Sequence, residues 1–419
     1  MPSFQTTPGT RDILPPDAAR WRAFVESFDS VVSLAGFQHI VVPMFEDLGV
    51  FQRLGDATDV VTKEMYDFVD KGGRHVALRP EQTAGVCRSF AQHRPTAPWK
   101  VWYGGPNFRY ERAQHGRYRQ FDQVGVEALG SDDPLLDVEV IALAVEFFHG
   151  LGLRNVVLNI NSLGDSGDRA RYVDALAQYF EGHLAELSPE SVATLQRNPL
   201  RVLDSKRENE QGVVSQAPSI SGYLSDEAAS HFAQVKQGLD ALGISYVVNE
   251  RLVRGLDYYC RTTFEFQSTA LESAQTAVGG GGRYDGLVED LGGPATPGIG
   301  FAIGLDRTLL ACDAENVFAH PSSQADVFVI DTTGGMQALQ LCQQFRSAGL
   351  SSERTYGARA MKAQMKAADK SGASFAVIIG SDELSQGVAT VKSMVDGNQE
   401  EVTLDSVVRH VATQLGKVI

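Results

Sequence analysis

Cysteine is scarce in this chain of 419 residues, and its four cysteines stand far apart, at positions 87, 260, 312 and 342. No CxxC pair, HExxH motif or other Cys/His cluster has the spacing of a zinc site, so the sequence argues against a structural metal. Dispersed thiols are typical of a reducing compartment. A chain of this length buries enough surface to fold without such cross-links.

Long apolar runs are also missing. The most apolar helix-like stretch, residues 138–148, is interrupted by Glu139 and Glu146 and falls far short of the ~20 residues that a membrane span needs. The N-terminal segment MPSFQTTPGTRDILPP lacks the apolar core of a secretory signal peptide. We therefore expect a soluble, cytoplasmic protein.

Positive charge is in the minority. The 37 Lys and Arg residues stand against 52 Asp and Glu residues, which gives a net charge of −15. This balance excludes a protein that coats nucleic acid through its overall charge, but it is compatible with local basic patches. From Ser323 onward the chain holds 9 basic and 10 acidic residues, so almost all of the excess negative charge belongs to the first 322 residues.

The order of helix-like and strand-like segments predicts an α+β fold with an antiparallel sheet flanked by helices. A polar, helical region at about 165–247 separates two strand-rich regions, and we interpret it as an insertion. Residues 320–324 (HPSSQ) have the composition of a linker. We predict a first domain over residues 1–322 and a small α/β domain over 323–419. The expected helices include 17–35 and 134–148, and the expected strands are 37–42, 75–79, 101–110, 118–129, 260–267 and 298–304.

One stretch, YGGPNFRYERAQHGRYRQFDQVGVE (residues 103–127), gathers several chemically useful side chains. Arg109 and Glu111 share a face at the end of one expected strand, and Phe121, Gln123 and Glu127 share a face on the next. An arginine, an aromatic ring, an amide and a carboxylate would then line one surface beside a basic turn. A solvated sheet face with a charged hairpin would show the same alternation.

Four further segments carry candidate residues. RLVRGLDYY (251–259) places Arg254 before a glycine bend, and LRPEQTAG (78–85) places Glu81 and Thr83 after an extended run. AVGGGGRYDG (277–286) lacks the lysine of a P-loop and is expected to be a close-packed or flexible turn. GIGFAIGLDR (298–307) predicts a strand followed by a helix that begins near Arg307.

These segments, in this order, resemble those of the class II aminoacyl-tRNA synthetases. GFQHIVVP resembles motif 1 of the class, FRYER resembles motif 2, and GIGFAIGLDR resembles motif 3. RLVRGLDYY and GGRYDGL resemble two signatures of the histidyl-tRNA synthetase family. The resemblance covers nearly the whole chain and implies a class II catalytic domain with a helical insertion and a C-terminal anticodon-binding domain. It implies an ATP-dependent ligase that forms histidyl-adenylate and pyrophosphate, then transfers histidine to the 3′ end of tRNA(His).

The resemblance also implies an ATP site. Arg109 matches the arginine that contacts the α-phosphate, and Glu111 matches the residue that meets the adenine edge. Phe121 and Arg307 match the pair that sandwiches the adenine, where stacking and cation–π attraction act together. Arg117 matches the residue that reaches the terminal phosphates of a bent ATP.

Arg254 matches a signature arginine that, in this family, stands where other class II enzymes place a magnesium ion. A planar guanidinium suits that position because it can span the α-phosphate and the amino-acid carboxylate at once. Arg254 and Arg109 are therefore the candidate catalytic residues. Mg²⁺ on the β- and γ-phosphates is implied, with no protein ligand to name.

For histidine, the resemblance implies two groups of contacts in addition to Arg254. Glu81, Thr83 and Gln123 match the residues that hold the ammonium group. Glu127 and Tyr259 match those that bracket the imidazole nitrogens, with Tyr284 close by. A ring with one donor and one acceptor needs such a matched pair of polar groups. The chain departs from the family pattern at Gln82, where glycine is usual, and at Ala113, where proline is usual.

Contacts with tRNA are implied at two places. Gln114 and Arg119 lie in the motif 2 hairpin, which approaches the acceptor end in this family. In the C-terminal domain, four basic residues at helical spacing would form one helix face, opposite a face made by Ala358, Met361, Met365 and Ala368. They are Arg359, Lys362, Lys366 and Lys370. A solvated helix face would look the same, but in a tRNA-binding protein we expect phosphate contacts. The family is also homodimeric, with motif 1 at the interface.

The main alternative is a synthetase-like subunit that binds histidine and regulates the first enzyme of histidine biosynthesis without aminoacylating tRNA. Such proteins typically lack the C-terminal domain and a complete RLVRGLDYY signature, both of which this sequence has. A class II synthetase of threonine or proline type would not carry Glu127 with Tyr259 in its pocket. A protein that only binds RNA would not need the arginine set of the adenylate site.

Overall fold

The computed structural model describes residues 4–52, 60–112, 116–205, 207–252, 257–272, 276–321, 325–357 and 359–418. The chain divides into two compact units, Met1–His320 and Pro321–Ile419, each with its own hydrophobic core. The prediction of a mixed helix and sheet fold with a large antiparallel sheet is confirmed. None of the helices in the described part of the chain is long and apolar enough to cross a membrane.

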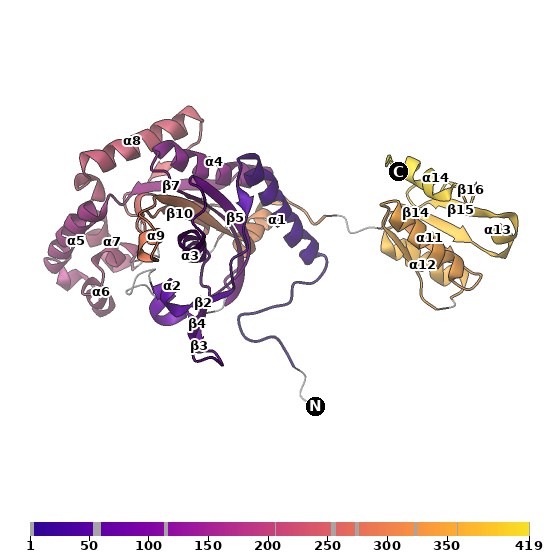
Figure 1. Ribbon diagram of the computed structural model, residues 1–419, viewed down its shortest axis with the longest axis horizontal. Helices are drawn as coiled ribbons and strands as arrows, with labels where there is room; N and C mark the ends of the chain where they lie inside the picture. Colours follow the sequence, from indigo (N-terminus) through magenta and orange to yellow (C-terminus); the bar gives the residue numbers. More distant parts are fainter. Residues whose placement is uncertain are drawn as a thin grey trace. The chain divides into compact units, whose positions relative to one another are not determined.

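Eight strands form the main sheet of the first unit, in the order β1-β5-β6-β11-β10-β9-β7-β8 (Figure 1). The six inner strands pair antiparallel, whereas β1 and β8 run parallel to their neighbours at the two edges. Long inner strands therefore lie side by side in the middle of the sheet. The strands are β1 (Gln38–His39), β5 (Trp99–Phe108), β6 (Gln120–Leu129), β7 (Val156–Ser162), β8 (Val247–Val248), β9 (Cys260–Ser268), β10 (Ala277–Arg283) and β11 (Gly298–Gly304).

One face of this sheet is covered by helices and forms the main core. Helix α1 (Asp17–Leu34) buries Phe24, Phe28 and Val32, which recur at the four-residue spacing of an amphipathic helix. These side chains pack with α4 (Pro134–Gly150), α8 (Asp226–Ala241) and the inward side chains Val124 and Val126 of β6. Helix α10 (Leu305–Glu315) follows β11 and adds Ala311 and Cys312 to the same core.

The opposite face of the sheet is only partly covered, by α3 (Thr83–His93) and α9 (Leu287–Asp290). Because successive side chains on a strand point to opposite faces, Phe121, Gln123 and Glu127 of β6 lie on this face while Val124 and Val126 lie in the core. A small sheet, β2-β4-β3, leads into α3. Its strands are β2 (Phe45–Asp47), β3 (Tyr66–Val69) and β4 (His75–Leu78), with α2 (Leu48–Gln52) and the helical turn Val60–Glu64 between β2 and β3.

The region predicted as an insertion divides between two cores. Residues 172–224 form a separate cluster built on α5 (Ser166–Glu181), α6 (Pro189–Leu195), α7 (Gln211–Gln216) and the short turns between them. Helix α8 packs instead against α4, and its Phe232, Val235 and Leu239 belong to the main core. The independent part of the insertion therefore ends before α8.

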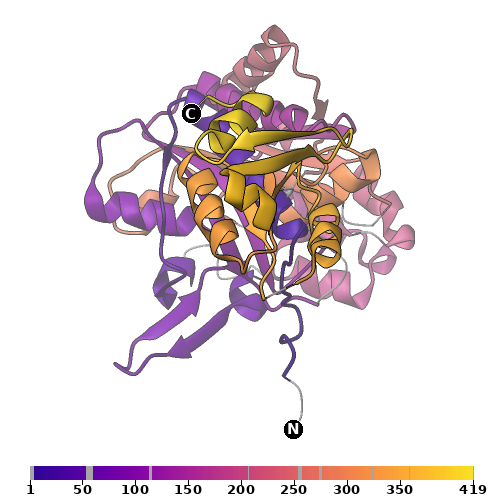
Figure 2. The same ribbon diagram turned by 90° about the vertical axis from the view of Figure 1, so that its right-hand side faces the viewer.

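The C-terminal unit is a five-stranded sheet in the order β13-β12-β14-β15-β16, with helices on both faces (Figure 2). Val327 and Val329 of β12 pack against α11 and α14, and Phe328 and Ile330 face α12. Its elements are β12 (Val327–Asp331), α11 (Met336–Ser347), β13 (Ser352–Arg354), α12 (Met361–Ser371), β14 (Phe375–Ile379), α13 (Ser381–Gln386), β15 (Val388–Ser393), β16 (Gln399–Thr403) and α14 (Val407–Gln414).

Two local predictions are wrong. The glycine-rich stretch expected to be a turn forms β10, a central strand between β9 and β11. A side chain on Gly281 would overlap the carbonyl oxygen of Gly300, so glycine is needed there for close strand pairing rather than for turning. The strand expected over 37–42 is reduced to Gln38–His39, because Val41 is 81% exposed and Pro43 has no N–H to donate to a ladder.

Candidate functional site

Most of the site residues predicted in the first unit line one cavity of about 280 Å³ on the open face of the main sheet. It lies over β5, β6, β9, β10 and β11, where Gly279, Gly280 and Gly300 leave room above the strands. The predicted residues that line it are Glu81, Thr83, Arg109, Glu111, Arg117, Phe121, Gln123, Tyr259, Tyr284 and Arg307. Glu127 lies directly behind Thr83 and Tyr284 and contacts both.

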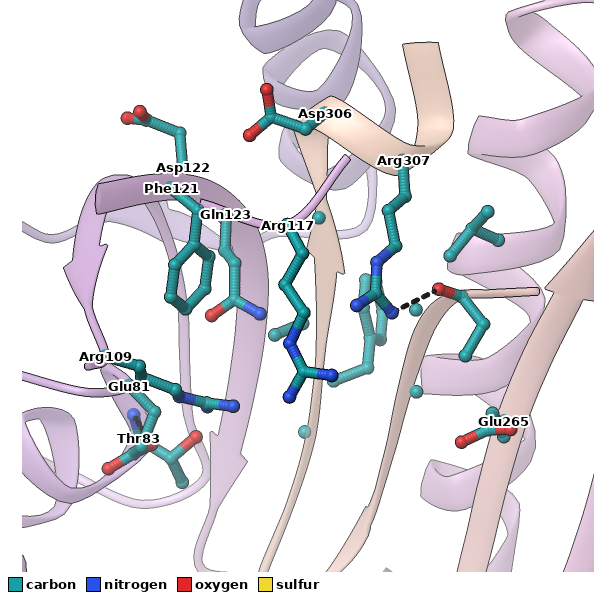
Figure 3. Close-up of a pocket in the computed structure, with 18 of the residues that line it drawn as sticks. Glu81, Thr83, Arg109, Arg117, Phe121, Asp122, Gln123, Glu265, Asp306 and Arg307 are labelled. Atoms are coloured by element: carbon teal, nitrogen blue, oxygen red, sulfur yellow. Dashed lines mark hydrogen bonds between the residues drawn. The ribbon is translucent and has the colours of Figure 1, made fainter. Parts of the chain in front are cut away.

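Three guanidinium groups enter this cavity from different elements (Figure 3). Arg109 follows β5, donates from Nε to the carbonyl oxygen of Pro80 at 2.9 Å, and lies 5.4 Å from the centre of the Phe121 ring. Arg117 forms an ion pair with Glu111, and Arg307 donates to the carbonyl oxygen of Ala277 at 3.2 Å. Burial lowers the pKa of all three arginines. Cations gathered in a partly dehydrated cavity favour a ligand with several negative charges.

At the other end of the cavity, a ring of hydroxyl groups surrounds the carboxyl group of Glu127. When the group is ionised, its Oε1 accepts from Thr83 Oγ1 at 2.6 Å and from the Tyr103 hydroxyl at 3.0 Å, and its Oε2 accepts from the Tyr284 hydroxyl. Glu127 is 1% exposed. Burial raises its pKa to about 8, against the opposing effect of the hydrogen bonds from Thr83 and Tyr284. A carboxyl group that titrates near neutrality suits a ring nitrogen that also gains or loses a proton there.

Glu81 occupies the start of helix α3. Its carboxylate accepts from the backbone N–H of Thr83 at 2.6 Å and of Ala84 at 3.0 Å, which satisfies two N–H groups of the first turn. Burial raises the pKa of Glu81 in spite of these bonds. The same contacts fix the carboxylate at the edge of the cavity.

The neighbouring departure from the family pattern, Gln82, is buried and points away from that edge. Its Nε2 donates to the carbonyl oxygen of Gly105 at 3.4 Å, so the larger side chain reaches towards β5. Ala113, the other departure, lies outside the described residues, as do the predicted site residues Gln114 and Arg254.

Several cavity residues were not predicted from the sequence. Tyr103, Tyr258 and Glu265 line the cavity, and burial raises the pKa of both tyrosines well above its usual range. Tyr103 lies on the same face of β5 as Arg109, and the alternation of that strand is the signal that could have identified it. Figure 3 shows Glu265 of β9 on the Arg307 side of the cavity.

The N-terminal segment also reaches this site. Arg11 forms an ion pair with Asp306 and donates to the Tyr118 hydroxyl at 2.9 Å. The carbonyl oxygen of Gly9 accepts from the backbone N–H of Arg119 at 2.8 Å. The segment therefore ties the return strand of the motif 2 hairpin to the start of α10, which carries Arg307. The sequence alone does not show this connection between the hairpin and α10, because Arg11 and Asp306 are 295 residues apart.

The predicted tRNA contacts lie on both units. In the first unit, Arg119 is half-buried, donates to the carbonyl oxygen of Glu111 at 3.2 Å and stacks 3.8 Å from the centre of the Tyr110 ring. In the second unit, Lys362, Lys366 and Lys370 are exposed on α12, one turn apart.

The predicted composition of that helix needs two corrections. Arg359 lies before α12, which begins at Met361, so it extends the basic stripe from the preceding loop rather than from the helix. The inward face is held by Gln364, which is 2% exposed and donates to the carbonyl oxygens of Asp331 and Arg359, together with the buried Ala368. Met361 is 38% exposed, and Ala358 lies outside the described residues.

Comparison with known proteins gives matches over both units. Residues 9–308 match the family model described as Histidyl-tRNA synthetase, and residues 324–414 match the one described as Anticodon binding domain. The Histidine–tRNA ligase of Lysinibacillus sphaericus is 46% identical, over 98% of this chain and 100% of its own length.

Solved structures are similar as well. The crystal structure of apo S. aureus histidyl-tRNA synthetase has a TM-score of 0.83 and 37% identity, and covers 98% of this chain and 100% of that one. A Bacillus halodurans structure titled as an ATP phosphoribosyltransferase regulatory subunit/histidyl-tRNA synthetase has a TM-score of 0.62, at 20% identity. It covers 87% of this chain and 96% of that one and shares the fold.

Proposed function

The chain belongs to the histidyl-tRNA synthetase family, and we propose on this basis that it is a histidine–tRNA ligase. In the first step a histidine carboxylate oxygen attacks the α-phosphorus of ATP, and the bond to the leaving pyrophosphate breaks. In the second step the histidyl group passes to the 3′ end of tRNA(His). The observation that carries this proposal is the cavity itself, which joins a cluster of arginines to a buried carboxyl group ringed by hydroxyls.

The arginine end of the cavity is the proposed ATP site. Arg109 would bind the α-phosphate and Arg117 the terminal phosphates, while Phe121 and Arg307 would hold the adenine between them. Figure 3 supports the sandwich, because Phe121 and Arg307 extend from opposite sides of the cavity. Glu111 would meet the adenine edge once Arg117 exchanges their ion pair for phosphate oxygens.

Adenylate formation needs little proton transfer, so orientation and charge stabilisation should supply most of the rate. Arg254, which the sequence assigns to the α-phosphate and the histidine carboxylate, completes the proposed catalytic pair with Arg109.

The hydroxyl-ringed end is the proposed histidine site. Glu127 and Tyr259 would bracket the two imidazole nitrogens, with Tyr284 held against Glu127. Glu81, Thr83 and Gln123 line the same cavity, and the backbone of the amino acid would sit among them. A buried polar pocket of this kind discriminates strongly against analogues that lack a ring nitrogen, because its own groups would then be left unpaired.

Mg²⁺ is proposed to arrive on the ATP phosphates. Among the described residues no cluster of three or more His, Cys, Asp or Glu side chains could hold a metal ion. Mg²⁺ needs only one or two protein carboxylates when phosphates and water supply its other ligands, and Glu265 faces the cavity. When bound, it would neutralise the β- and γ-phosphate charge.

The remaining partners follow from the two units. For tRNA(His), we propose contacts to Gln114 and Arg119 of the first unit and to Arg359, Lys362, Lys366 and Lys370 of the second.

A homodimer is proposed through motif 1 and the adjoining small sheet, where Val41 is 81% exposed and Phe45 is 58% exposed. A cytoplasmic location is proposed because all four cysteines are free thiols.

Histidine-dependent exchange of labelled pyrophosphate into ATP tests the proposed function. We expect exchange with histidine and none with threonine or proline. Tight histidine binding without exchange would support the regulatory-subunit alternative. The match of residues 324–414 to the anticodon-binding domain argues against that alternative.

A further inference from the structure

Asn107, on β5 behind the cavity, carries an amide that no step of the proposed mechanism uses. It is 0% exposed, and its Nδ2 donates to Oε1 of Gln123 on the neighbouring strand at 2.9 Å. Its own Oδ1 is buried without a hydrogen-bond partner among the described residues. Burying an asparagine whose amide oxygen has no hydrogen-bond partner costs folding free energy. This favours a functional role for the one hydrogen bond that the side chain makes.

That bond fixes which way round the Gln123 amide lies. Either arrangement makes one hydrogen bond between the two amides. Turning both would leave both N–H groups of Asn107 buried without a partner, whereas the observed arrangement pairs one of them and leaves Oδ1 unpaired in exchange. Buried N–H groups are left unpaired more rarely than carbonyl oxygens. The observed orientation is therefore favoured. It places Oε1 of Gln123 against Asn107, and Figure 3 shows the Gln123 nitrogen turned towards Arg117, in the middle of the cavity.

The backbone around Asn107 is held rigidly enough to define this geometry. Arg79 donates from Nε to the carbonyl oxygen of Pro106 at 2.8 Å, and the N–H of Phe108 donates to the carbonyl oxygen of Arg79 at 2.9 Å. Gln82 reaches the carbonyl oxygen of Gly105 from the same loop. The segment on either side of Asn107 is thus tied to the loop that carries Glu81 and leads into α3.

We infer that Asn107 is a positioning residue that turns the Gln123 amide so that its N–H groups donate to the carboxylate of the bound amino acid. This inference rests on the proposed function and specifies the chemistry of one of its contacts. The carboxylate is the attacking group, so a donor fixed on one of its oxygens leaves the other oxygen directed at the α-phosphorus. Gln123 thereby selects for a carboxylate rather than serving as an acceptor for the ammonium group.

The experiment uses the full-length protein and two fragments of histidine as competitive inhibitors of pyrophosphate exchange. Imidazolepropionate keeps the ring and the carboxylate but lacks the ammonium group, and histamine keeps the ring and the ammonium group but lacks the carboxylate. In Asn107→Leu we expect the KM for histidine and the inhibition constant of imidazolepropionate to rise roughly three- to tenfold, the effect of losing one ordered hydrogen bond. The inhibition constant of histamine and the KM for ATP should change less than twofold.

A double-mutant cycle separates positioning from structural damage. Gln123→Met should show the same selective loss of imidazolepropionate, and adding Asn107→Leu to it should change nothing further, because Asn107 acts through Gln123. Asn159→Leu is the matched control, since Asn159 is a 7% exposed asparagine on β7 that lines no part of the cavity. It should leave all four constants unchanged.

A selective loss of histamine binding, equal losses of both fragments, or additive effects in the double variant would overturn the inference. So would a KM for histidine in Asn107→Leu that stays at the wild-type value. Absence of exchange in the wild-type protein would instead reject the proposed function, which keeps the two failures distinct.

Discussion

The buried carboxyl group of Glu127 gives the most direct test of the site's electrostatics. We consider Glu127→Gln, which keeps the shape of the side chain and removes its ability to ionise. The hydroxyls of Thr83, Tyr103 and Tyr284 can accept as well as donate, so they can turn to satisfy the new amide. The substitution therefore isolates the cost of the charge.

The magnitude follows from the pKa. Burial raises the pKa of Glu127 from 4.5 to about 8, and each unit corresponds to ~1.4 kcal/mol, so ionisation should cost the folded state about 5 kcal/mol. Between pH 4.5 and about pH 8, Glu127 keeps a proton in the folded protein that it has lost in the unfolded chain. Wild-type stability from this group is therefore fully present below pH 4.5 and is lost as the pH rises towards 8.

The assay is urea unfolding without ligands, followed by tryptophan fluorescence. All three tryptophans, Trp21, Trp99 and Trp102, lie in the first unit, so the signal reports the unit that holds Glu127. We expect the difference in unfolding free energy, Glu127→Gln minus wild type, to rise by ~1 kcal/mol per pH unit between pH 5 and 8. Above pH 8 this difference should become constant. Glu186→Gln, at an exposed position, is the control and should show no such trend. If the difference in unfolding free energy between Glu127→Gln and the wild type did not change with pH, the conclusion that Glu127 is buried and protonated would be refuted.

Three further predictions concern activity. Arg254→Ala should lower histidine-dependent exchange by roughly 10²–10³-fold, as expected when a preorganised charge donor is lost, and normal turnover would reject its assigned role. Lys362→Ala combined with Lys366→Ala should weaken tRNA charging at physiological salt and leave exchange intact, whereas equal loss in both assays would mean that α12 is structural. The KM for histidine should rise roughly tenfold per pH unit below about pH 6.5, because an imidazolium must release a proton to bind beside protonated Glu127. A KM that is flat between pH 5 and 6.5 would contradict this.

Strands that alternate strictly were predictable from the sequence. In β6 the apolar Val124 and Val126 face the core, and Phe121 and Gln123 face the cavity, as the two-residue period requires. The strand predicted at 298–304 is β11, and Arg307 lies in the first turn of α10. Local pattern was sufficient here because each residue's environment is decided by the faces of its own strand.

Other features depend on neighbours that are distant in the sequence. The turn prediction for the glycine-rich β10 was wrong because the close approach of Gly281 to Gly300 depends on the pairing of two strands, which the local sequence does not show. The donors around Glu127 are 24, 44 and 157 residues away, so no local pattern shows them. The resemblance could place Glu127 in the pocket, but it could not give the protonation state that burial imposes.

The tertiary environment of each side chain, which composition does not show, also explains how an acidic chain can hold a cavity for a polyanion. The net charge of −15 counts every carboxylate equally, but most of those that line the cavity have a hydrogen-bond or ion-pair partner of their own. Glu81 accepts from two backbone N–H groups, and Glu111 and Asp306 each form an ion pair with an arginine. Glu127 is held protonated by its own burial at neutral pH. Three guanidinium groups are therefore held where phosphates can reach them, although the chain as a whole is acidic, and its net negative charge disfavours non-specific contact with nucleic acid.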